Sequence, residues 1–105
     1  MNAKKTLAQA VKRLAEGFRP QKIILFGSHA RGTADSRSDF DLLVIMPIKV
    51  ERRSIMLEMD RALRGLNMAV DIVVLTPKEF NIDRQIPGTV ARPAWLEGKV
   101  LYERH

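Results

Sequence analysis

The chain has 105 residues, of which 46% are hydrophobic and none is cysteine. That length predicts a single domain over residues 1–105, with one core and no separate substrate domain. The lack of cysteine excludes disulfides and thiolate metal sites and suits a reducing cytosol. No apolar run approaches the roughly 18–20 residues of a membrane span, and no secretion-signal pattern follows the basic N-terminus. We therefore expect a cytoplasmic protein that does not enter a membrane.

The formal net charge is +6, from 18 basic and 12 acidic residues. Single-stranded nucleic acid is typically bound by a basic stripe that also carries stacking aromatic rings. Aromatic residues make up only 6% of this chain, and the basic residues occur in scattered pairs. Direct nucleic-acid binding is therefore disfavoured. A solvated surface, or one that matches an acidic partner or a nucleotide, fits the charge better.

The first predicted element is an amphipathic helix over residues 3–17, where apolar residues recur at helical spacing before Pro20 forbids continuation. Residues 22–26 are apolar and β-branched, which predicts a short buried strand. Gly27-Ser28 then leads into a helical turn at residues 29–31. Ser28 is expected to be its N-cap, and a helix start presents free N–H groups to an anion.

Residues 33–38 are rich in Ser, Thr and Asp, which predicts a loop. Residues 40–46 predict a second strand, ended by Pro47. Residues 51–66 place their apolar positions on one helical face, which predicts a helix. The composition of residues 69–75 then predicts a third, buried strand.

The sequence Thr76-Pro77-Lys78-Glu79 is typical of a helix start, with an N-cap, a proline and a first-turn acid. Residues 81–88 show no clear pattern. Residues 89–97 predict a short helix interrupted by Pro93, and residues 99–102 a last strand or an edge extension. The alternation of helices and strands predicts an α/β (α+β) fold, with a small mixed sheet flanked by helices.

Three aspartates stand out, because a charge is costly to bury among apolar residues unless it is paired. Asp39 and Asp41 are two residues apart at a strand start, so their carboxylates project to one face about 7 Å apart along the chain. Asp71 lies within the third apolar run. If the two strands are neighbours, the three carboxylates converge. Such a group would suit two Mg²⁺ ions that bracket an in-line phosphoryl transfer.

Gly27 and Ser28 are expected to hold a triphosphate through backbone N–H groups and the Ser hydroxyl. For Arg31, the alternatives are phosphate neutralisation, contact with a partner or an ordinary surface ion pair. For His29, surface filling is favoured over contact with a nucleotide.

A structural alternative also exists for the acidic set. In it, Ser28 and Asp39 merely cap turns, and Asp41 and Asp71 pair with arginines. Trp95 and Tyr102, near the C-terminus, are expected to anchor the core rather than to mark an interface.

Residues 27–32 (Gly-Ser-His-Ala-Arg-Gly), followed by residues 38–44 (Ser-Asp-Phe-Asp-Leu-Leu-Val), resemble the nucleotidyltransferase signature of the DNA polymerase beta superfamily. The match is best with its minimal nucleotidyltransferase (MNT) branch. Residues 97–102 are similar to the usual ending of those small proteins, whereas residues 81–93 carry no supporting motif. The resemblance implies a polymerase beta-like fold, ATP with Mg²⁺ as cofactor, and nucleotidyl transfer that releases pyrophosphate.

By position, the resemblance implies that Asp39, Asp41 and Asp71 are catalytic metal ligands, and that Asp71 also takes the acceptor's proton. Gly27 and Ser28 would bind the β- and γ-phosphates. MNT proteins are commonly antitoxins paired with a HEPN-domain ribonuclease. The resemblance therefore implies transfer of AMP onto a tyrosine of such a toxin, which silences it.

Two other functions stay open at this point: a binding antitoxin that acts by occlusion, and a dimeric small-molecule nucleotidyltransferase. The second is disfavoured, because no aromatic-lined acceptor site is evident. A chain this short leaves little material for a second substrate pocket, so the acceptor is expected to supply much of its own binding surface. The acceptor's identity, the nucleotide, the number of AMP units and the oligomeric state are left open.

Overall fold

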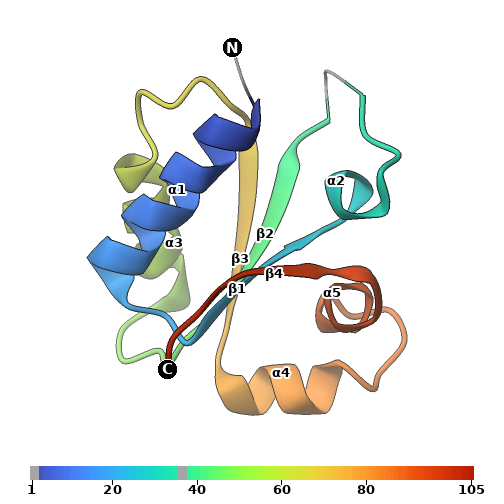
Figure 1. The fold of residues 1–105 in the computed structure, drawn as a ribbon. Helices are drawn as coiled ribbons and strands as arrows, with labels where there is room; N and C mark the ends of the chain where they lie inside the picture. The colour runs from blue at the N-terminus through green and yellow to red at the C-terminus, as the bar shows by residue number, and fades with distance from the viewer. Residues whose placement is uncertain (1–2, 36–37) are drawn as a thin grey trace.

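The computed structural model describes residues 3–35 and 38–105. Within them, four strands form one sheet in the order β3-β2-β1-β4 (Figure 1). Parallel pairing joins β2 to β3, whereas β1 pairs antiparallel with both β2 and β4. The predicted mixed sheet is therefore confirmed. The strands are β1 (Lys22–Phe26), β2 (Phe40–Ile45), β3 (Val70–Leu75) and β4 (Lys99–Glu103).

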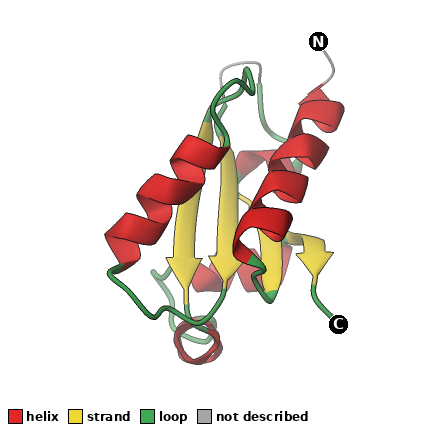
Figure 2. Ribbon diagram, turned by 90° about the vertical axis from the view of Figure 1, so that its left-hand side faces the viewer, coloured by secondary structure: helices red, strands yellow, loops and turns green. Residues whose placement is uncertain are grey.

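Helices cover both faces of the sheet. They are α1 (Ala3–Phe18), α2 (Ser28–Arg31), α3 (Arg52–Ala62), α4 (Pro77–Asp83) and α5 (Ala91–Glu97). Figures 1 and 2 show α1 and α3 side by side against one face. The opposite face carries α4 and α5, with α2 beyond the end of β1 (Figure 1). Residues 36–37 of the predicted loop 33–38 lie outside the described residues.

The two faces of the sheet have separate apolar cores, because side chains along a strand alternate between faces. In β2, Leu42 and Val44 pack in the core with α1 and α3. Leu43 and Ile45 pack in the core with α4 and α5. The same alternation assigns Asp41 to the α4–α5 side of the sheet.

The third helix is shorter than the predicted span of residues 51–66, because α3 ends at Ala62. Beyond it the chain tightens into a turn, in which the Leu63 N–H donates to the carbonyls of both Met59 and Asp60, each at 3.2 Å. Gly65 then takes a φ of +88°, which a helix cannot accommodate. The glycine was a correct stop signal, but the helix ends one turn before it.

Pro93 does not interrupt the helix that contains it, contrary to the sequence prediction. It is the third residue of α5. Amides in the first turn of a helix have no intrahelical acceptor, so a proline there removes no hydrogen bond.

Trp95 is 46% exposed, so the prediction that it anchors the core is wrong. The buried residues of α5 are Ala91 and Ala94. Only small side chains fit there, because α5 lies close against β1: a Cβ added at Gly98 would collide with the Ala94 carbonyl and the Ile24 side chain. The helix therefore turns its large side chains outward.

The fourth helix begins as predicted. Thr76 is its N-cap, and a capping box is complete: the Glu79 N–H donates to the Thr76 hydroxyl, and the Thr76 N–H donates to the Glu79 carboxylate. Arg52 of α3 also donates to both oxygens of that carboxylate, at 2.7 and 2.6 Å. The bond from the Thr76 backbone and the Arg52 guanidinium hold the pKa of Glu79 below its ordinary value.

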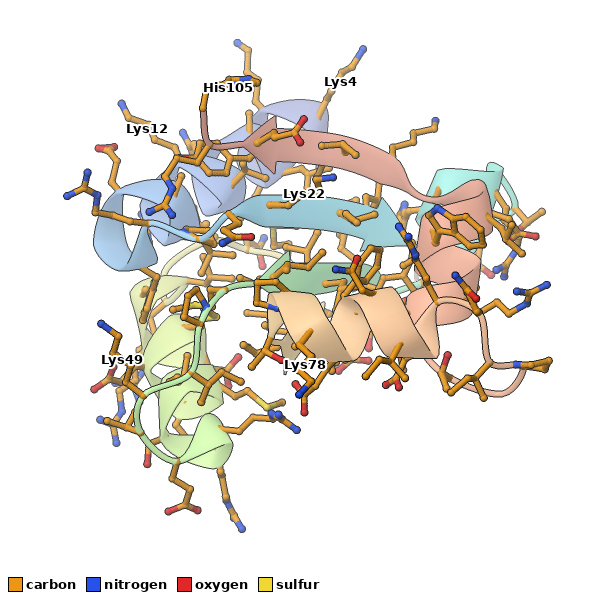
Figure 3. The ribbon with its side chains drawn as sticks, turned by 90° about the horizontal axis from the view of Figure 1, so that it is seen from below. Lys4, Lys12, Lys22, Lys49, Lys78 and His105 are labelled. Carbon is orange, nitrogen blue, oxygen red and sulfur yellow. The ribbon has the colours of Figure 1, made fainter. Side chains whose placement is uncertain are left out.

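No helix in the described part of the chain has the length and apolarity needed to span a bilayer. Basic side chains are spread over several elements. Figure 3 shows Lys4 and Lys12 on α1, Lys49 ahead of α3 and Lys78 on α4 pointing outward in different directions.

Candidate active site

Two of the three aspartates occupy opposing positions on neighbouring strands. Asp41 of β2 pairs in register with Asp71 of the parallel strand β3. Paired residues on neighbouring strands project to the same face of a sheet. Both carboxylates therefore lie on the α4–α5 side, near the ends where β2 and β3 begin. The neighbouring strands therefore bring Asp41 and Asp71 to one face. The sequence argument expected Asp39 to converge with them as well, and that convergence of three stays a prediction.

Asp71 differs from its sequence prediction in one respect. The sequence placed it in the middle of a buried strand, but it is the second residue of β3 and its side chain is exposed. Only alternate residues from Ile72 onward are buried. Solvent therefore reaches the Asp71 carboxylate. A side chain that contacts a second substrate needs such access.

Asp39 directly precedes β2 and is exposed. Strand pairing starts one residue later, where the Phe40 N–H donates to the Ala69 carbonyl at 2.9 Å. Burial raises the pKa of Asp41, and the negative charges of Asp71 and Asp39 raise it further. Asp39 and Asp71 thus both lie near enough to Asp41 to act on its charge.

Gly27 brings the backbone against the Asp41 carboxylate. It has a φ of +75°, and a Cβ at this position would collide with Asp41 Oδ2. Its carbonyl accepts from the N–H groups of Ala30 and Arg31, each at 3.1 Å, so Gly27 is the N-cap of α2. The prediction that Ser28 is the N-cap is therefore wrong: Ser28 is the first helical residue. Glycine takes the cap position because only glycine adopts that backbone and allows the approach.

His29 ties this helix to the segment that carries Asp39. Its ring stacks on Phe40, with centroids 3.8 Å apart and planes 13° apart. Its Nε2 lies 3.0 Å from the Ser38 carbonyl oxygen, which can only accept, so Nε2 donates. His29 is partly buried, so the surface-filling expectation is wrong. Sequence reasoning missed this positioning role, because the contacts depend on a loop whose path the pattern does not specify.

Arg31 forms an ordinary surface ion pair, one of the alternatives left open by the sequence. Its Nη1 lies 3.7 Å from Glu97 Oε2 of α5, and both side chains are about half exposed. Such pairs contribute little to stability. The contact nevertheless joins α2 to α5, and the positive charges of His29 and Arg31 oppose the rise in the Asp41 pKa.

Magnesium fits these acids in one specific way. In residues 3–35 and 38–105, no group of three or more His, Cys, Asp or Glu side chains is arranged to hold a metal ion. Magnesium is usually bound by one or two carboxylates together with waters and substrate phosphates, rather than by an all-protein cage. Asp41 and Asp71 offer such a pair, and a cation would relieve their mutual repulsion.

The structural alternative, in which arginines neutralise Asp41 and Asp71, is not what the structure shows. The ion pairs found among the described residues include Lys22–Glu103, Arg31–Glu97 and Arg52–Glu79, and neither Asp41 nor Asp71 takes part in any of these three. The acids at the start of β2 and β3 are therefore left available to a ligand.

A protein-family model described as nucleotidyltransferase domain matches residues 4–102. A protein from Methanocaldococcus jannaschii, whose name describes it provisionally as a protein adenylyltransferase, is 30% identical over 104 residues. The alignment covers 97% of this chain and 100% of that protein.

Solved structures are similar in fold. A chain from a variant of the MntA–HpeT toxin–antitoxin complex gives a TM-score of 0.64 and 25% identity, over 100% of this chain and 75% of that one. A chain from the complex of a tri-AMPylated Shewanella oneidensis HEPN toxin with an MNT antitoxin gives a TM-score of 0.56 and 22% identity. That match covers 96% of this chain and 72% of the other.

The close approach of Gly27 to Asp41 predicts unequal effects of two alanine substitutions. Gly32→Ala places a side chain at a φ of +78° with nothing within 4 Å, so it should cost about 1 kcal/mol of unfolding free energy. Gly27→Ala adds the collision with Asp41 and should cost about 3 kcal/mol. Urea unfolding of both variants measures the difference. Equal losses would contradict the contact with Asp41.

Burial of Asp41, together with the acids beside it, predicts that Asp41→Asn stabilises the fold. Because the pKa of Asp41 is raised, the folded chain disfavours its ionised form, and stability is lost as the pH rises through the folded pKa. The variant should therefore have a higher unfolding free energy than the wild type at pH 7, and the difference should shrink as the pH falls below 4. Asp60→Asn, at an exposed position on α3, is the matched control. A destabilised Asp41→Asn variant would show that burial and the neighbouring acids do not disfavour the Asp41 carboxylate in the folded chain.

Proposed function

The chain belongs to the nucleotidyltransferase domain family, and we propose that it is a Mg²⁺-dependent protein adenylyltransferase that acts as an antitoxin. In this proposal, residues 1–105 are one minimal nucleotidyltransferase domain that works in the cytoplasm. It transfers AMP from ATP to a tyrosine of a HEPN-domain ribonuclease toxin and thereby silences the toxin. The observation that carries the proposal is the register of Asp41 with Asp71 beside the Gly27 backbone.

Each site residue has a role in this reaction. Asp41 and Asp71, with Asp39 completing the set as nucleotide binds, would hold two Mg²⁺ ions together with waters and phosphate oxygens. The ions would supply charge neutralisation and orientation of the triphosphate when bound. Gly27 and Ser28 would hold the β- and γ-phosphates through N–H groups at the start of α2 and the Ser28 hydroxyl. Arg31, the last residue of this one-turn helix, would add positive charge near the phosphates.

The exposed position of Asp71 suits a second role toward the acceptor. The tyrosine oxygen attacks the α-phosphorus and forms the new P–O bond. The bond from that phosphorus to the bridging oxygen breaks, and pyrophosphate leaves. The hydroxyl proton would pass to the Asp71 carboxylate, which is exposed to solvent.

The descriptions of the similar proteins support a protein as the acceptor of AMP. One is described provisionally as a protein adenylyltransferase, and one complex contains a tri-AMPylated HEPN toxin with an MNT antitoxin. The small size of the chain is consistent with a protein acceptor, because a protein brings its own binding surface.

A non-catalytic antitoxin that neutralises its toxin by binding is the second candidate. One observation favours it: several large apolar side chains between residues 82 and 100 are exposed, and a partner would cover them. The two candidates differ in whether the acids are needed for neutralisation.

We expect the protein encoded by the adjacent gene to be a HEPN-domain toxin, and incubation of that protein with this chain, α-labelled ATP and Mg²⁺ should label it. Asp39→Ala combined with Asp41→Ala should reduce the label by at least about a hundredfold, because it removes the carboxylates that hold the metal and triphosphate. The complex itself should still form, as measured by gel filtration.

Asp60→Ala, an exposed acid on the opposite helix layer, is the control and should label like the wild type. A folded wild-type chain that binds the toxin without labelling it would contradict the transferase proposal. If the double variant still protected cells fully, occlusion would be the function instead.

A further inference from the structure

An apolar groove lies between α1 and the edge strand β4. It has a volume of about 650 Å³, and its lining is mainly apolar. Leu7 and Val11 of α1 line one wall, and Leu101 and Tyr102 of β4 line the other. These four side chains are half-buried, because each also packs against the core that α1 shares with α3. The groove is therefore one continuous depression whose floor belongs to the core.

A β-bulge shapes the wall that β4 contributes. Tyr102 pairs with Ile23. Val100 pairs with Ile24, the next residue of β1, so Leu101 is an extra residue in β4. Both Leu101 and Tyr102 pack on the α1 side of the sheet, where regular alternation would direct only one of them. A bulge in an edge strand also disfavours addition of a further strand, so the groove calls for another kind of occupant.

The wall that α1 contributes suits a second helix. Residues that line the groove recur along α1 from Lys4 to Glu16. At 1.5 Å per residue, this stretch is about 18 Å long. Ala8 and Ala15 are among the lining residues, two turns apart, and small side chains let two helices approach closely. An amphipathic helix of about 12 residues therefore matches the length of the groove.

The charged residues that line the groove are mainly basic. They are Lys4, Lys12 and Lys99, together with one acid, Glu16. Lys99 pairs in register with Leu25, which is buried in the core on the α1 side, so both side chains project to that face. Figure 3 shows Lys4 and Lys12 projecting from α1 into solvent. A helix with acidic residues beside its apolar face would complement these charges.

A second copy of the chain is a poor occupant for this groove. Two copies related by a two-fold axis would bring the same surface together, so the lysines of one groove would meet those of the other. The net charge of +6 on each copy adds to the repulsion. The charges therefore favour a different protein, one that carries acidic residues.

We propose that the groove between α1 and β4 is a docking site for an amphipathic α-helix of a protein partner, with an apolar face flanked by acidic side chains. The groove lies on the α1 side of the sheet, whereas Asp41 lies on the α4–α5 side. A helix in the groove does not contact the acids, so this contact and the candidate active site use separate surfaces.

The test is fluorescence anisotropy of a labelled helical peptide of about 14 residues, titrated with the full chain. The peptide carries leucines along one helical face and glutamates beside them, and a second peptide has lysines in place of the glutamates. The glutamate peptide should bind at least about tenfold more tightly than the lysine peptide.

Two variants of α1 locate the binding site. Ala8→Glu adds bulk and a negative charge inside the groove, at an exposed position where glutamate is a good helix former. It should raise the Kd of the glutamate peptide at least about tenfold. The matched control is Gln9→Glu, which adds the same charge at the next exposed residue of α1, outside the groove lining. It should change the Kd less than about twofold.

Circular dichroism checks that both variants are folded. Absence of peptide binding, equal affinity for the two peptides or equal weakening by the two variants overturns the proposal. A dimer that Ala8→Glu dissociates in sedimentation would assign the groove to a second copy, and binding to phosphatidylserine vesicles without peptide binding would assign it to a membrane surface. Either result also overturns the proposal. The titration contains neither ATP nor toxin, so its outcome is independent of the proposed transferase activity.

Discussion

Parallel pairing of β2 with β3 places the carboxylates of Asp41 and Asp71 side by side near the start of both strands. That arrangement works against folding, because burial and like charges raise the Asp41 pKa. Proteins retain such locally unfavourable arrangements where function needs them. The mixed sheet, with apolar cores on both faces, supplies the stability that offsets this repulsion. A bound cation shared with phosphate oxygens would remove the repulsion between the two carboxylates. The same repulsion that disfavours folding would therefore favour binding of a cation.

Two local devices fix what surrounds the acids. Gly27 combines a left-handed backbone with the absence of a side chain, which lets the start of α2 touch the Asp41 carboxylate. His29 joins the other side of α2 to Ser38 and Phe40, which flank Asp39. The Gly27 backbone and the acids are thereby held at a short separation by a helix of four residues. The same helix reaches α5 through the ion pair between Arg31 and Glu97.

Strong local patterns sufficed to predict the strands, the mixed sheet and the Thr76 cap, and the nucleotidyltransferase family is confirmed by the family match. The signature pointed to Asp39 and Asp41 as site residues, and the acid within the third apolar run pointed to Asp71. The catalytic roles of all three stay predictions. What failed depended on tertiary contact. Ser28 is a good N-cap residue, but the crowding at Asp41 gives the cap to Gly27. Trp95 is apolar enough for a core, yet the tight packing of α5 on β1 admits only alanine there.

The most direct test is a crystal structure of the chain with Mg²⁺ and a non-hydrolysable ATP analogue. The account predicts a metal ion about 2.0–2.1 Å from carboxylate oxygens of both Asp41 and Asp71. It also predicts that the β- and γ-phosphates contact the backbone of Gly27 and Ser28. A triphosphate bound elsewhere on the molecule, or a metal held by neither aspartate, would contradict it.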